Sequence, residues 1–137
     1  MKSYNVSKTT IYIRKDLVYR YSDINIIDSF DFEGNESNKM FLSKEKAEAY
    51  YNDLINYSDI VTRRLKTGFL YYKLTRITID EIVFDENEVN EEINEKINEE
   101  NIDDYKSCIF EYSTNIENIS EYRHNKKDLE KYRKEHN

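Results

Sequence analysis

Apolar and polar residues alternate with a period of two near the start of the chain, between residues 9 and 32. Three short groups share a face: Ile11 and Ile13; Leu17, Tyr19 and Tyr21; and Ile24 and Ile26. Alternation of this kind is typical of half-buried strands. The stretch therefore predicts two or three strands, with a tight turn at Lys15 and Asp16.

A helix is predicted next. The polar, glycine-containing residues 33–40 (EGNESNKM) favour an exposed, mobile loop. Ser43 can then cap a helix with Glu45 in its first turn. Apolar residues recur behind it at helical spacing: Ala47, Tyr50, Tyr51, Leu54 and Ile55. Val61 and Leu65 would extend this stripe, whereas residues 56–58 (NYS) could break it, and we expect a bent or broken helix that ends near Gly68.

Residues 69–84 are rich in aromatic and β-branched side chains and predict the central strand. Their apolar positions change face midway, because Leu74 continues one parity and Ile77 begins the other. A bulge near Thr75 and Arg76 would explain the change, and so would a strand covered on both faces. In the second case Leu74 and Ile77 are both buried.

The last third of the chain predicts three further elements. Val89, Ile93 and Ile97 give residues 86–104 one narrow helical stripe. Residues 105–112, with Cys108, resemble a strand, and residues 116–137 predict a charged C-terminal helix with fraying ends. Helices and strands mix without regular alternation, so residues 1–137 predict one α+β domain, with a mainly antiparallel sheet of about four or five strands and two to four helices.

Charge is distributed unevenly. Residues 80–104 contain 12 acids and one base, a local charge of −11, and because the whole chain carries −7 the other residues sum to +4. Eight of these carboxylates are the candidate partner-binding residues: Glu88, Glu91, Glu92, Glu95, Glu99, Glu100, Asp103 and Asp104. Glutamates four apart repel each other on a helix. A cationic partner would relieve this repulsion, and a row of carboxylates can stand in for phosphates in a basic groove.

Two interpretations of the acids stay open. They form either a partner-binding surface or a solvated face, neutralised in part by the basic C-terminal residues of the same chain. If they bind a partner, replacing Glu91, Glu95 and Glu99 with glutamine leaves the fold intact and weakens the binding.

A basic and aromatic region is the alternative site, for direct nucleic-acid binding. It comprises Arg63, Arg64, Lys66, Tyr72, Lys73 and Arg76. Bases interleaved with aromatic rings can hold a single strand by stacking and by contacts to phosphates. A net charge of −7 disfavours this interpretation. A small structural or oligomeric protein, including a homodimer, is a further alternative.

The sequence provides little support for catalysis, cofactors or metals. Its two histidines, His124 and His136, lie in the charged C-terminal stretch, where we expect exposed side chains. Phosphate-binding loops, nucleophile elbows and zinc-protease motifs are missing, and the acidic stretch lacks the glycine of a calcium-binding loop. Cys108 beside Ile109 and Phe110 favours a small core residue. We therefore expect a non-enzymatic protein without cofactor or metal.

The hydropathy of the chain is the basis for the expected cellular location of the protein. The first residues contain no apolar stretch of secretory length, and no apolar run approaches the roughly 20 residues of a membrane span. We expect a cytoplasmic protein that does not bind membranes.

The chain resembles the small accessory proteins of phages and mobile elements of low-GC bacteria. The resemblance lies in its size, its acidity, its richness in Tyr, Asn and Ile, and segments such as SKEKAEAYYNDL (43–54) and YYKLTRITIDEIVFDEN (71–87). Among such proteins are anti-CRISPR proteins and similar inhibitors that act as acidic decoys. The resemblance implies an inhibitor that engages a basic nucleic-acid-binding groove of a host defence enzyme.

Overall fold

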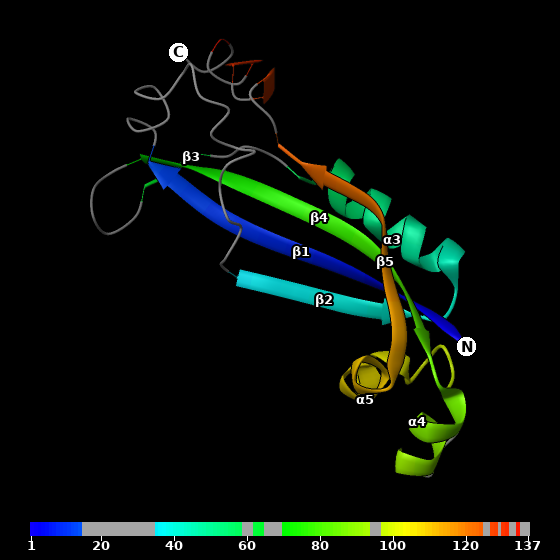
Figure 1. Cartoon of the computed structure of the whole chain (residues 1–137). Helices are drawn as coiled ribbons and strands as arrows, with labels where there is room; N and C mark the ends of the chain where they lie inside the picture. The colour runs from blue at the N-terminus through cyan, green and yellow to red at the C-terminus, as the bar shows by residue number, and fades with distance from the viewer. Residues whose placement is uncertain are drawn as a thin grey trace.

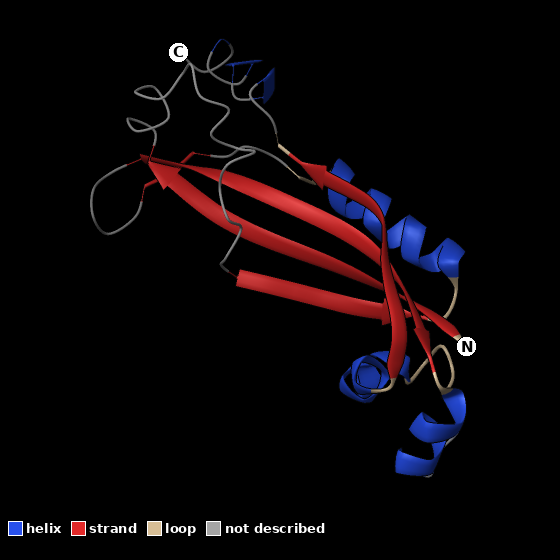
Figure 2. Cartoon of the chain, viewed as in Figure 1, coloured by secondary structure: helices blue, strands red, loops and turns tan. Residues whose placement is uncertain are grey.

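The protein has an α+β fold built on an antiparallel sheet (Figures 1 and 2). The computed structural model describes residues 1–14, 35–58, 62–64, 70–93, 97–124, 127–128, 130–131 and 134. Within them lie five strands: β1 (Lys2–Arg14), β2 (Asn35–Phe41), β3 (Thr62–Arg64), β4 (Leu70–Phe84) and β5 (Ser113–Arg123). β1 lies between β2 and β4, while β3 and β5 pair with successive stretches of β4 along its other edge.

β4 is the central strand, as predicted. Leu74 and Ile77 point to opposite faces, and both are fully buried. The pairing between β1 and β4 runs without a break past Thr75 and Arg76, so a bulge there does not explain the change of face. The change of face is explained by the second possibility, because the strand is covered on both faces.

One face of the sheet packs against α3 (Lys44–Asn56). Ser43 caps this helix, since its side chain accepts a hydrogen bond from the Lys46 N–H, and Ala47 and Tyr51 are buried as their spacing predicts. The partners of α3 on the sheet are Tyr4, Val6, Phe41, Ile77 and Ile79. Figure 1 shows α3 running along the sheet behind β4 and β5.

The expectation that this helix continues toward Gly68 is wrong. Tyr57 closes the helix: its N–H donates to the Asp53 carbonyl at 3.1 Å, and the next N–H, that of Ser58, donates to the Ile55 carbonyl at 3.1 Å. The Ser58 hydroxyl donates to the Leu54 carbonyl at 2.6 Å, which satisfies a carbonyl that the helix end leaves without a partner. Residues 62–64 then form β3.

The other face is covered at one end by three short helices: α4 (Glu86–Ile93), the 3₁₀ helix η1 (Ile102–Tyr105) and α5 (Lys106–Glu111). They bury a second cluster: Met40, Ile82, Phe84, Val89, Ile97, Ile102 and Ile109. Val89 and Ile97 confirm two of the three positions of the predicted stripe, and the Ile93 side chain lies outside the described residues.

A single helix over residues 86–104 is wrong. α4 ends at Ile93, and residues 99–101 form a turn. Asn98 and Asn101 hold this turn together, because the side chain of each accepts a hydrogen bond from the backbone N–H of the other. Such side-chain contacts compete with helical hydrogen bonds.

Three other expectations are also corrected. The predicted loop over residues 33–40 is mostly β2, a polar edge strand that buries Met40. The predicted strand over 105–112 is mostly α5, and apolar residues at 102, 105, 109 and 112 have the matching helical spacing. The predicted helix from residue 116 is strand β5 as far as Arg123, and a shift in the pairing with β4 leaves Ile119 without an opposite residue. The predicted strands at 17–26 lie outside the described residues.

Candidate functional site

Two carboxylates fasten the acidic segment to the sheet. Glu99 Oε2 accepts hydrogen bonds from the backbone N–H groups of Leu42, at 3.1 Å, and Ser43, at 2.9 Å. Asp103 Oδ1 accepts from the Met40 N–H at 2.8 Å. Glu99 and Asp103 are therefore used inside the molecule, at the end of β2 and the start of α3, where the sequence pattern placed them on a partner-binding surface.

Lys106 continues this contact along β2. Its Nζ lies 3.7 Å from Asp103 Oδ1 and donates to the Asn38 carbonyl at 3.3 Å. β1 occupies the inner edge of β2, so these groups satisfy the outer edge. Asp103 and Lys106 thus bond to backbone groups of β2 that a further strand would otherwise bond to. This protects the outer edge of β2 from pairing with another chain.

The other candidate carboxylates divide into exposed residues and residues that are not described. Glu88, Glu100 and Asp104 are exposed. The side chains of Glu91 and Glu92, and the whole of Glu95, lie outside the described residues. Asp85 caps α4, with its Oδ1 accepting from the Asn87 and Glu88 N–H groups at 3.0 and 3.4 Å. We call the exposed set Glu88, Glu100 and Asp104 the acidic end.

The acidic end has a fixed position on the fold. Glu100 and Asp104 directly follow the anchoring residues Glu99 and Asp103, and Glu88 lies on the helix whose Val89 is buried in the second cluster. Figure 1 shows α4 and α5 together at one end of the sheet. Carboxylates held in this way can attract a cationic surface at low ionic strength with little loss of backbone freedom.

The basic and aromatic alternative site is only partly assembled. Tyr72 is 0% exposed, so its ring belongs to the core of the sheet and is not available to stack on a base in this alternative site. Arg63 and Arg64 lie in β3 opposite Tyr71 and Leu70. Lys73 is half-buried in β4, and Lys66 lies outside the described residues.

His124 is not the exposed side chain that its charged neighbours suggest. It is 3% exposed, and its Nδ1 accepts a hydrogen bond from the Thr75 N–H at 3.1 Å while its own backbone N–H donates to the Thr75 carbonyl at 3.3 Å. These two bonds extend the pairing of β4 with β5 by one residue. The imidazole is thus part of the sheet, with Nδ1 as an acceptor.

Cys108 is half-buried and packs beside the second cluster from α5. Its place beside the core agrees with the expected small apolar role, although it lies on a helix. Among the described residues, no three His, Cys, Asp or Glu side chains form a group that could hold a metal ion. None of the helices described is long and apolar enough to cross a membrane.

The fold and these contacts define an α+β protein with an anchored acidic segment at one end of its sheet. No protein-family model, curated protein or solved structure matches the chain.

Proposed function

We propose that this chain is a non-enzymatic binding protein whose acidic end engages a basic, nucleic-acid-binding groove of another protein and inhibits it. This is the mode of the anti-CRISPR-like inhibitors that the chain resembles in size and charge. The observation that carries the proposal is the pair of anchors, Glu99 and Asp103, which hold the acidic segment on β2 and leave Glu88, Glu100 and Asp104 exposed.

Anchoring matters because a phosphate-mimicking surface must present its charges at fixed positions. A mobile acidic tail would lose conformational entropy on binding, whereas a surface already held on the sheet avoids most of that loss. The charges that hold the segment are separate from the exposed charges. Neutralising the acidic end therefore tests binding without disturbing the anchors.

The test compares two variants with the same change of charge. One carries Glu88→Gln, Glu100→Gln and Asp104→Asn. The control carries Glu45→Gln, Asp53→Asn and Glu117→Gln, which replace exposed carboxylates elsewhere on the fold. Each immobilised protein captures partners from a nuclease-treated lysate of a low-GC bacterium, and bound proteins are eluted with excess duplex DNA.

The wild type and the control are expected to capture the same nucleic-acid-binding protein, which the duplex DNA displaces. The acidic-end variant is expected to capture it at least about tenfold less well at physiological salt, because its exposed charges no longer steer association. Equal capture by both variants, or a captured protein that DNA does not displace, would contradict the proposal.

A further inference from the structure

Three polar side chains lie side by side on the sheet face away from α3: Ser3 and Asn5 of β1 and Asp80 of β4. Asn5 is paired with Asp80, and Ser3 precedes Asn5 by two residues. Their neighbours Val6 and Ile79 pack under α3, so these three side chains face the other way. Opposite residues of an antiparallel pair have Cβ atoms about 5 Å apart, and the other two sides of this triangle are about 7 Å. One small ion between them can therefore contact an oxygen of each.

Two of these side chains are buried with an oxygen that makes no hydrogen bond. Ser3 is 0% exposed and Asn5 is 4% exposed. Within the part of the chain that the structure describes, no group bonds to Ser3 Oγ or to Asn5 Oδ1. The Asn5 amide is oriented by its Nδ2, which donates to Ser7 Oγ at 2.9 Å and leaves Oδ1 turned away from Ser7. A buried oxygen without a partner is destabilising, so both atoms favour a ligand that brings positive charge or a donor.

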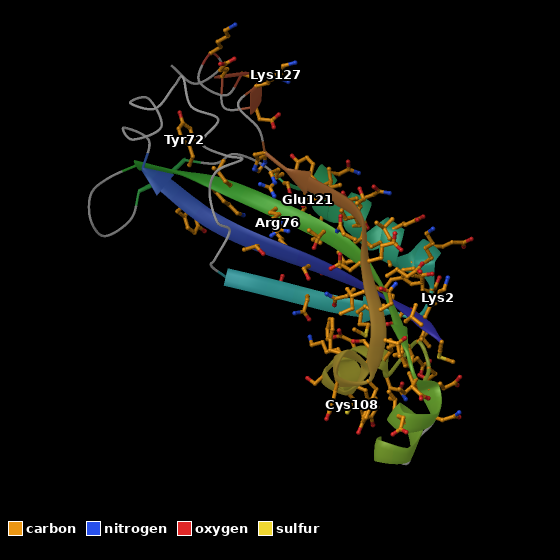
Figure 3. The ribbon with its side chains drawn as sticks, viewed as in Figure 1. Lys2, Tyr72, Arg76, Cys108, Glu121 and Lys127 are labelled. Atoms are coloured by element: carbon orange, nitrogen blue, oxygen red, sulfur yellow. The ribbon has the colours of Figure 1, made fainter. Side chains whose placement is uncertain are left out.

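Asp80 supplies negative charge to this group. Its Oδ1 accepts a hydrogen bond from Asn118 Nδ2 at 2.9 Å, and none of the described bases lies within ion-pair distance of it. Arg76, the nearest base of β4 on this face, is about 13 Å along the strand, and its Nε lies 3.4 Å from Glu121 Oε1 (Figure 3). Lys106 donates to a carbonyl at the outer edge of β2, beyond β1. The charge of Asp80 is therefore not neutralised by the described residues.

We propose that Ser3 Oγ, Asn5 Oδ1 and the Asp80 carboxylate form a binding site for one monovalent alkali cation, sodium or potassium. Carboxylate, amide and hydroxyl oxygens are ligands for hard cations, and water completes the coordination on the side of Asp80, which is half-buried. One carboxylate balances a single positive charge, whereas a divalent cation would keep an uncompensated charge in a largely buried site. The site uses none of the carboxylates of the acidic end, so it does not rest on the proposed function.

Thermal unfolding of the full chain tests the site. It is followed by circular dichroism in sodium, potassium and choline chloride at one ionic strength, because choline is too large for these three oxygens to surround. The melting temperature is expected to be higher by about 2 to 6 °C in sodium or potassium chloride once the alkali cation exceeds its dissociation constant about tenfold.

Two variants with the same loss of charge separate this site from a general effect of the salt. Asp80→Asn is expected to abolish the difference between the alkali chlorides and choline chloride. Asp53→Asn, which changes an exposed carboxylate of α3, is the matched control and is expected to keep the full difference. An ordered water would satisfy the same oxygens whatever the salt. Equal melting temperatures of the wild type in all three chlorides would therefore overturn the inference, and so would differences of equal size in the two variants.

Asn5→Asp provides a second test, which decides the question if Asp80→Asn does not fold. It places two carboxylates opposite each other, and together these balance a divalent cation. The variant is expected to gain a rise in melting temperature with calcium chloride that the wild type does not show. Asn52→Asp is the control, because it adds a carboxylate to the exposed surface of α3. A calcium response no larger in Asn5→Asp than in Asn52→Asp would mean that these side chains do not converge on one ion, and the inference would be wrong.

Discussion

Glu99 is expected to hold the acidic segment on the sheet, and replacing it with alanine tests this. One of its carboxylate oxygens accepts two backbone hydrogen bonds, from Leu42 and Ser43. A hydrogen bond to a charged group contributes about 1.5 to 3 kcal/mol, but the half-buried position of Glu99 lets water replace part of it. We therefore expect Glu99→Ala to lower the free energy of unfolding by about 2 to 3 kcal/mol.

The conservative variant gives an intermediate result. Glu99→Gln keeps an acceptor oxygen but loses the charge, so about 1 kcal/mol should be lost. The loss falls on the start of α3 as well, because Ser43 is the residue whose side chain caps that helix. This expectation differs from that of the sequence pattern, which treats Glu99 as exposed and its replacement by glutamine as harmless.

Urea unfolding followed by far-ultraviolet circular dichroism measures both losses. Glu100→Ala is the control, since Glu100 is an exposed neighbour and its replacement should change the stability by no more than about 0.5 kcal/mol. Equal and small losses at Glu99 and Glu100 would refute the anchoring role.

Three further outcomes are expected. Leu74→Ala and Ile77→Ala should each cost about 2 to 5 kcal/mol in urea unfolding, because both side chains are fully buried; losses below about 0.5 kcal/mol would mean that β4 is not central. His124→Ala should cost about 1 to 3 kcal/mol by leaving a β4 N–H without its acceptor, and His136→Ala, the control histidine, should not reproduce this loss. Burial, with a smaller contribution from a nearby aspartate, raises the pKa of Tyr122 above 10.0, so the unfolded chain loses this proton first as the pH rises. The stability from this hydroxyl is present below about pH 10 and is lost above it, and Tyr122→Phe should flatten the alkaline fall of the melting temperature; an unchanged fall would contradict the assignment.

Local sequence pattern was enough to predict two elements, α3 and β4. α3 has its cap and its stripe in consecutive turns, and β4 has the composition of a buried strand. Both were predicted near their observed positions, except for the end of α3. At the C-terminal end of α3, the Ser58 hydroxyl donates a hydrogen bond to the Leu54 carbonyl, in place of the backbone N–H that would donate to it if the helix continued.

Edge strands gave weaker signals. β5 exposes its residues 114–121 and is held mainly by its backbone to β4, so its side chains show no clear alternation. Ile116 and Ile119 are three residues apart, which is a spacing that also fits a helix. Strand β5 accommodates this spacing because its pairing with β4 is irregular around Ile119. For α5 a usable signal was present in residues 102 to 112, but β-branched and aromatic residues pointed to a strand.

The sequence by itself determined the α+β class, the α3 and β4 segments, and the separation of an acidic segment from a mildly basic remainder. These depend on hydrophobic period and on charge, which are properties of neighbouring residues. Only the tertiary structure decided which charged and polar groups are used internally. Glu99 and Asp103 became anchors because β2 and the two residues after it place N–H groups more than 50 residues away beside them, and His124 was buried because β5 returns to Thr75. Contacts between residues so far apart in the chain leave no local pattern from which they could be predicted.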